Sequence, residues 1–184
     1  MPNQMPTFAV TSGGLVFYIR HEEASTPEPN PKSQNSVTVG ADGFDEINSL
    51  VTISFETNGQ LKQIFFFCSI DEFGRNFGLV FTPSSSNIFI GGGKLSAVIN
   101  IRSMEIIRET INSCMFWRFE QINNHVVEFG EVECYLYGLN GEKIDDCVVD
   151  PPYEYEVEDD EITFQSPVFG KQSLQFIKIA DTAK

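Results

Sequence analysis

The alternation of apolar and polar positions is clearest in VTISFETNGQLKQIFFFCSI, residues 51–70. Asn58-Gly59 at its centre predicts a β-hairpin, because a type I′ turn needs positive φ at both central residues. With these two residues as the loop, the cross-strand pairs on one face are Val51 with Phe66, Ile53 with Ile64 and Phe55 with Lys62. That face is mostly apolar, which predicts a hairpin packed inside a layered β structure.

Short alternating segments bounded by Gly, Pro, Asn and Ser recur along the chain, roughly a dozen in all. The cleanest is 94–102, which we expect to be a half-buried strand. There is no alternation of strands with helices and no repeat of fixed period. The pattern predicts a single all-β domain over residues 1–184, a two-sheet antiparallel β-sandwich in jelly-roll or other Greek-key order. A closed β-barrel is the alternative.

Two segments depart from this pattern. Residues 103–111 are the one helix candidate, since Met104, Ile107 and Ile111 share a helical face, although a strand fits nearly as well. Residues 21–36 contain prolines at 27, 29 and 31 and no large apolar side chain. We expect this stretch to be a mobile loop of polyproline II character and the first site of proteolysis.

A second Asn-Gly pair, Asn140-Gly141, places Cys134 directly opposite Cys147 in a hairpin. Counting outward from the turn puts the two cysteines at a non-hydrogen-bonded position, where Cα atoms lie about 4.5 Å apart. A disulfide is sterically feasible there, though strained. No signal peptide is visible, so we expect two reduced thiols in contact.

Acidic residues line one face of the expected ribbon 153–166, whose turn we place at Asp159-Asp160. They are Glu154, Glu156, Glu158 and Glu161, and Glu158 lies across from Glu161. A bound divalent cation would relieve this repulsion, which makes the four residues candidate calcium ligands. The alternative is a solvated tip screened by salt. Asp42, Asp45 and Glu46 form a second candidate set, with too few oxygens to bind calcium alone.

The formal net charge of −14 disfavours binding to nucleic acid or to anionic membrane surfaces and favours cationic partners. The four cysteines form no C-x-x-C pair, so no zinc site is expected. No run of about 18 apolar residues is present, so no membrane span is expected. With no recognisable targeting segment, we expect a cytoplasmic location by default.

No catalytic motif stands out. The run Gly91-Gly92-Gly93 before Lys94 lacks P-loop spacing, and we interpret it as a turn or a sheet-edge bulge. The two histidines, His21 and His125, are expected in solvated turns, and no G-x-S-x-G motif occurs. Trp117 is a candidate platform for stacking a sugar ring, with burial in the core as the alternative.

These observations favour a non-enzymatic structural or interaction module that self-assembles or binds a protein partner. The alternative is a carbohydrate-binding module assisted by calcium, with a glycan as ligand. No other cofactor is expected. The sequence does not identify the partner.

Overall fold

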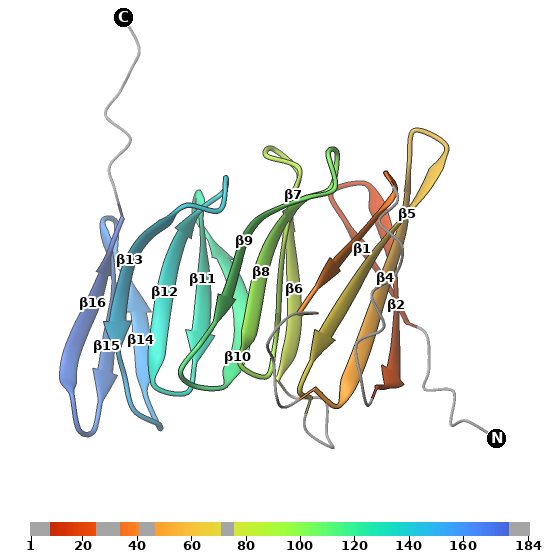
Figure 1. Cartoon of the computed structure of the whole chain (residues 1–184). Coiled ribbons are helices and arrows are strands. Elements are labelled where there is room, and N and C mark those ends of the chain that lie inside the picture. Colours follow the sequence, from red (N-terminus) through yellow and green to blue (C-terminus); the bar gives the residue numbers. More distant parts are fainter. Residues whose placement is uncertain (1–7, 25–33, 41–46, 71–75, 177–184) are drawn as a thin grey trace, which may run out of the picture.

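The computed structural model describes residues 8–24, 34–40, 47–70 and 76–176, and the regular structure in these ranges is all β (Figure 1). Sixteen strands form four sheets, here called A to D in chain order. Sheet A has the order β1-β2-β4-β5-β3 and comprises β1 (Phe8–Ser12), β2 (Leu15–Glu23), β3 (Ser36–Val39), β4 (Ser49–Thr57) and β5 (Gln60–Cys68). Sheet B comprises β6 (Phe77–Thr82), β7 (Asn87–Gly92), β8 (Leu95–Asn100) and β9 (Glu105–Ile111). Sheet C comprises β10 (Phe116–Ile122), β11 (His125–Gly130), β12 (Glu133–Gly138) and β13 (Lys143–Val148). Sheet D comprises β14 (Glu154–Val157), β15 (Glu161–Ser166) and β16 (Gly170–Gln175).

The four sheets stand side by side in a row (Figure 1). Sheets B, C and D are antiparallel meanders in which each strand pairs with the next one along the chain. In sheet A, β3 pairs with β5 in parallel, and the other pairs are antiparallel.

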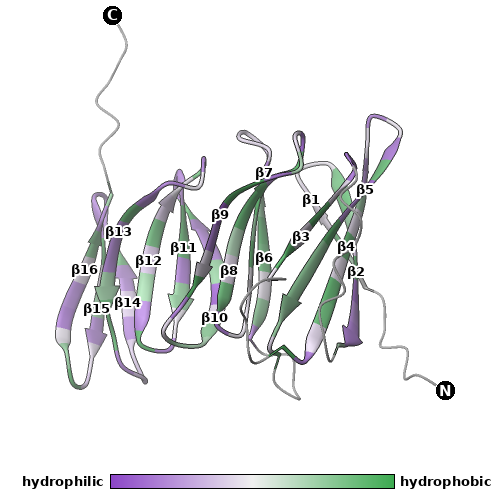
Figure 2. Ribbon diagram, viewed as in Figure 1, coloured by the Kyte–Doolittle hydropathy of each residue, from purple (hydrophilic) through white to green (hydrophobic). Residues whose placement is uncertain are grey.

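A separate hydrophobic core fills each space between neighbouring sheets. Phe17, Phe66 and Ile90 belong to the core between sheets A and B. Phe89, Phe116 and Tyr137 belong to the core between B and C, and the third core, between C and D, contains residues such as Phe129 and Phe164. Sheets B and C are therefore covered on both faces, which fits the mainly hydrophobic colouring of β6, β7 and β8 in Figure 2.

The predicted two-sheet sandwich is wrong, and so is the alternative of a closed barrel, because the strands form four small sheets in a row. Hairpin signals identify which strands pair, but they do not show where one sheet ends and the next begins. The segment 94–102 illustrates the problem, because its alternation suggested one wet face. Ser96 on the polar side of β8 is only 4% exposed, because that side faces sheet C.

The helix candidate at 103–111 is also wrong, because β9 occupies residues 105–111 and a turn precedes it. Asn100 explains the turn, since its Oδ1 accepts hydrogen bonds from the backbone N–H groups of Arg102 (3.0 Å) and Ser103 (3.1 Å). Met104 has a φ of 60°, in the left-handed region that no helix residue adopts.

The predicted register is confirmed throughout β4–β5, and in β12–β13 only beyond the bulge near the turn. In β4–β5 the pairs Val51–Phe66, Ile53–Ile64 and Phe55–Lys62 all form, and the turn residues Asn58 and Gly59 have φ values of 51° and 71°. In β12–β13, Cys134 pairs with Cys147. Nearer that turn a bulge shifts the register, so that Tyr137 pairs with Lys143 instead of Ile144.

Glycine brings three sheets close together at β7. A Cβ on Gly91 would lie 2.5 Å from the ring of Phe116 in sheet C, and a Cβ on Gly92 would lie 2.9 Å from Cys68 Sγ in sheet A. The expected turn is found only at Gly93, which has a φ of 61°. At Gly91 and Gly92 the expectation is wrong, because both lie buried inside the strand.

The segment 21–36 differs in part from the expected loop. Strand β2 continues through Glu23, and His21 pairs with Val51 in β4. His21 is therefore a strand residue, and its Nε2 lies 2.9 Å from Ser49 Oγ. Residues 25–33 lie outside the described ranges, so the predicted mobility of the proline-rich loop remains a prediction.

Candidate functional site

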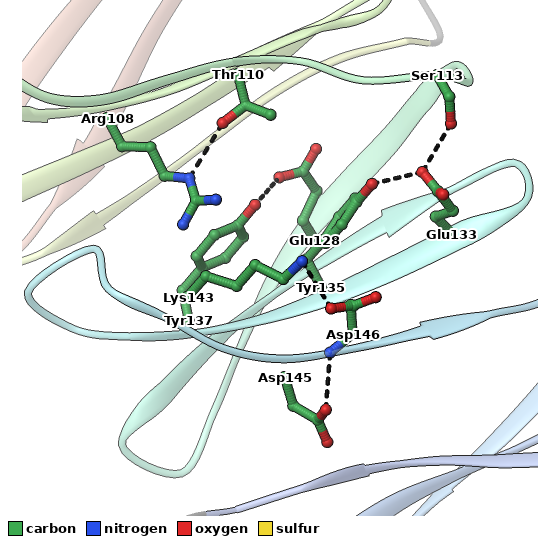
Figure 3. Close-up of polar contacts among 10 residues, drawn as sticks. All are labelled: Arg108, Thr110, Ser113, Glu128, Glu133, Tyr135, Tyr137, Lys143, Asp145 and Asp146. Atoms are coloured by element: carbon green, nitrogen blue, oxygen red, sulfur yellow. Dashed lines mark hydrogen bonds and ion pairs between the residues drawn. The ribbon is translucent and has the colours of Figure 1, made fainter.

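The interface between sheets B and C contains a buried polar network (Figure 3). At its centre is Glu128 on β11, whose side chain is only 2% exposed. Tyr137 donates a hydrogen bond to Glu128 Oε2 at 2.9 Å, and the Asn112 amide donates to Oε1 at 2.6 Å. The Arg108 guanidinium lies 5.2 Å from the centre of the Tyr137 ring.

Burial dominates the electrostatics of this network. Desolvation raises the pKa of Glu128, and the hydrogen bonds from Tyr137, Ser96 and Asn112 only partly oppose it. The Tyr137 hydroxyl likewise has a raised pKa, first because it is buried and second because Glu128 is close. Glu128 is only 2% exposed, and its hydrogen bonds to Tyr137 on β12 and to Asn112 after β9 join sheets B and C.

A second set of polar contacts lies nearer the surface of sheet C. Tyr135 donates a hydrogen bond to Glu133 Oε2 at 2.5 Å, and Ser113 donates to the same oxygen at 2.8 Å. Lys143 forms an ion pair with Asp146 at 2.6 Å and lies 4.9 Å from the centre of the Tyr135 ring. The Ser113 contact ties β12 to the loop that follows β9, and Lys143 ties the edge strand β13 to β12 (Figure 3).

Turns of sheets B and C form a groove of about 500 Å³, which has room for a ligand. Its lining residues are Ser84, Ser85, Asn124, His125, Gly138, Leu139, Asn140, Glu142, Lys143 and Ile144. His125 was expected in solvent, and this is wrong. His125 is only 8% exposed, and its ring stacks on Phe176, the residue after β16, at a centroid distance of 4.9 Å.

Aromatic and charged side chains join sheets C and D. Arg118 on β10 forms an ion pair with Glu120 at 2.6 Å, and its guanidinium lies 4.2 Å from the centre of the Phe129 ring. Tyr155 donates a hydrogen bond to Glu120 at 2.7 Å. Although burial opposes it, the hydrogen bonds from Arg118 and Tyr155 lower the pKa of Glu120.

Trp117 and the cysteine pair lie beside these contacts. Trp117 is half-buried, and its ring stacks on Tyr153 with a centroid distance of 5.3 Å and an interplanar angle of 8°. One ring face is therefore already occupied, which leaves less of Trp117 for a sugar. Cys134 and Cys147 are both buried free thiols, and the hydrogen bond to Cys134 raises the pKa of Cys147. The predicted pairing of the two cysteines across the strands is found, and their reduced state stays a prediction.

The acidic ribbon has the expected register, with Val157 opposite Ile162 and Glu154 opposite Gln165. Glu158 donates its backbone N–H to the carbonyl of Glu161 at 2.9 Å. The Glu161 side chain accepts a hydrogen bond from Gln175, which lowers its pKa. In the described ranges, no three His, Cys, Asp or Glu side chains come together in a way that could hold a metal ion. Asp42, Asp45 and Glu46 lie outside those ranges.

The exposed face of sheet A is the other distinctive surface, and sequence reasoning did not single it out. Val16, Tyr18 and Leu61 are 38%, 53% and 61% exposed on this face. Leu50 and Phe65 lie on the same face and are half-buried. The signal was present in the alternation of β2 and β5, where apolar residues occupy the positions opposite the core.

Comparisons with known proteins bear on the fold. No protein-family model and no characterised protein matched the sequence. Among solved structures, the chain is similar to the β-propeller domain of the Trilobed protease from Pyrococcus furiosus, described as having an open velcro topology, with a TM-score of 0.50 and 12% identity. The match covers 97% of this chain and 58% of that one, so the chain spans little more than half of that domain.

Two further matches have lower scores. BamB from Moraxella catarrhalis gives a TM-score of 0.39 at 11% identity and covers 73% of this chain and 41% of that one. HIRA(644-1017) gives 0.46 at 6% identity and covers 95% and 54%. The Pyrococcus match shows that the fold is β-propeller-like, with the four sheets in the place of blades.

In the described residues, no helix is long and apolar enough to cross a membrane.

Proposed function

We propose that the protein is a non-enzymatic interaction module that self-associates through the exposed face of sheet A. The observation that carries this proposal is a difference between the two ends of the row of sheets. Each end sheet has one face packed on its neighbour and one face turned outward. The outward face of sheet A carries exposed apolar side chains among polar ones, whereas that of sheet D is polar.

The outward face of sheet D is polar throughout. It presents Glu154, Glu156, Thr163, Gln165 and Gln175, while Val157, Ile162 and Leu174 face sheet C or its rim. Stacked-repeat proteins end in units whose outer face is polar, because that face has no partner to cover it. Sheet D therefore acts as a cap.

The outward face of sheet A has no such cap. Single exposed apolar residues are normal on a protein surface, but several on one sheet face indicate an interaction surface. Tyr18 lies near the middle of this face, paired through the backbone with Ser54. Tyrosine is enriched at protein interfaces because it combines a large apolar ring with a hydroxyl that stays hydrogen-bonded.

The size of the face suits a second copy of the chain. Three strands of nine residues, with β1 of five and β3 of four, cover roughly 570 Å² at about 3.3 Å per residue and about 4.8 Å between strands, which is close to the lower limit of about 600 Å² per partner for stable interfaces. Stable interfaces bury about 800 Å² per partner, and a two-fold axis would place the same face on itself. The charges on the face nearly cancel, since Arg20 pairs with Glu22 at 2.5 Å. Repulsion between two copies then comes mainly from the net charge of −14 on each chain. Salt screens this repulsion, so added salt should strengthen the dimer.

Sedimentation equilibrium tests this proposal. The unchanged protein should show a monomer–dimer equilibrium, which Tyr18→Lys should move to monomer by burying a charge at the centre of the interface. Gln165→Lys is the matched control, because it adds the same charge to the exposed face of sheet D. A monomer at every concentration, or a dimer that survives Tyr18→Lys with its affinity unchanged, would overturn the proposal.

A further inference from the structure

The groove between the turns of sheets B and C is separate from the exposed face of sheet A. The β6–β7 turn contributes Ser84 and Ser85, the β10–β11 turn contributes Asn124, and the β12–β13 turn contributes Asn140 and Glu142. Its volume of about 500 Å³ is within the usual range for small-ligand sites, roughly 300–1,000 Å³. A single long side chain with its flanking backbone would fill it.

We propose that this groove binds a basic side chain of a partner peptide, a guanidinium or an ammonium group, with the carboxylate of Glu142 as its counter-ion. The Glu142 carboxylate folds over Gly138 and occupies the place that a Cβ at that position would take. Glycine at 138 therefore leaves room for the Glu142 carboxylate beside it, and a larger residue would displace the carboxylate.

Glu142 is available to an incoming cation. Among the described residues, its carboxylate accepts no hydrogen bond and forms no ion pair. The neighbouring cation of the groove, Lys143, is engaged with Asp146 at 2.6 Å and lies over the Tyr135 ring. A guanidinium or ammonium group would thus form a charge-assisted hydrogen bond with a carboxylate that lacks one.

The rest of the groove suits the stem and the donors of such a side chain. Leu139 and Ile144 provide apolar contacts for the methylene groups of arginine or lysine, which bury their stems while the charged end stays polar. Ser84, Asn124 and Asn140 offer oxygen acceptors for additional N–H groups. The overall charge of −14 attracts cations and repels anionic ligands.

His125 provides a second, independent observation. It lines the groove, is more than nine-tenths buried, and its Nδ1 has no hydrogen-bond partner within the described residues. Burial lowers the pKa of His125, although Glu142 opposes the shift, so the ring is neutral near pH 7. A neutral ring does not compete with the ligand for the charge of Glu142.

Titration followed by NMR tests the assignment. N-acetyl-arginine amide and N-acetyl-lysine amide should each shift the ring resonances of His125 in a saturable way, and the comparison shows which cation fits better. Glu142→Gln keeps the shape of the side chain but removes its charge, and should weaken binding about tenfold or more, about 1.4 kcal/mol. Glu131→Gln, on the exposed β11–β12 turn, removes the same charge elsewhere and should bind as the unchanged protein does.

Either of two results would overturn the proposal. One is equal binding by Glu142→Gln and the unchanged protein. The other is no saturable shift with either cation, or an equal shift with N-acetyl-aspartate amide. Because the groove and the sheet A face are different surfaces, the outcome is independent of whether the protein dimerises.

Discussion

Replacing Gly91 with alanine tests the close packing of sheets B and C most sharply. The new methyl group would lie 2.5 Å from two ring carbons of Phe116, about 1 Å closer than ordinary carbon contacts. Phe116 is only 1% exposed and packs against Phe119 at a ring distance of 4.8 Å, so the ring cannot swing away. The two sheets would have to move apart, or the ring would have to leave its rotamer.

The net effect combines two terms. Overpacking of a core typically costs about 1–3 kcal/mol. Alanine recovers about 0.5–1 kcal/mol, because it restricts the unfolded chain more than glycine does. Gly91→Ala should therefore lower the free energy of unfolding by about 1–2 kcal/mol. Gly78→Ala is the matched control, because its methyl group would lie 3.3 Å from the same ring. It should change stability little or raise it.

Urea denaturation followed by the fluorescence of Trp117, the single tryptophan, measures both variants. In a Phe116→Leu background the cost of Gly91→Ala should shrink, because the smaller side chain leaves room for the methyl group. If Gly91→Ala proved as stable as Gly78→Ala, sheets B and C would not pack as described.

Three further predictions follow from buried groups and from the acidic ribbon. The folded-state pKa of Glu128 is raised, so the folded state binds the proton more tightly, and stability should fall as pH rises from the unfolded to the folded pKa. Glu128→Gln should abolish that part of the slope in urea midpoints measured from pH 4 to 8, and an unchanged slope would contradict the assignment. Oxidised glutathione should oxidise Cys134 and Cys147 to a cross-strand disulfide and leave as two molecules of reduced glutathione. Mass spectrometry would show the protein lighter by two hydrogens. A lasting mixed disulfide at either cysteine would count against their contact. Because, in the part of the chain that the structure describes, no three carboxylates of the acidic ribbon come together, millimolar calcium should give no heat and leave the Tm unchanged, and heat that Glu158→Gln abolishes would contradict this.

Local pairing could be predicted from the sequence because it depends on local chemistry. Asn58-Gly59 sets the positive φ values of its turn, and the register follows from the turn. The turn at Asn140-Gly141 differs from the predicted one, since only Gly141 has a positive φ and Gly138 N–H bonds to the carbonyl of Glu142. The bulge between Leu136 and Tyr137 offsets this one-residue shift, so that Cys134 still pairs with Cys147 as predicted.

The arrangement of sheets could not be predicted in this way. Hairpins look alike whether they belong to two large sheets or four small ones, and the difference depends on what covers each face. Gly91 and Gly92 carried this information, since adjacent glycines inside a strand permit close approach on both faces. They look the same as a turn when only the sequence is considered.

The groove was missed for a related reason. Its residues come from three turns that are distant in the sequence, and only the packing of sheet B against sheet C brings Ser84 near Asn124 and Glu142. Sequence reasoning placed His125 beside a turn but could not supply Phe176, which covers its ring.

Small-angle scattering over a concentration series tests the central claim most directly, that two copies join through the exposed faces of sheet A. Sheets pack about 10 Å apart, so four in a row span about 40 Å and a dimer joined end to end spans about 80 Å along the same direction. The account predicts that the particle mass doubles while its length along the row of sheets also doubles, and that salt favours the longer form. A mass that stays monomeric at every concentration, or a dimer that is no longer than the monomer, would contradict it.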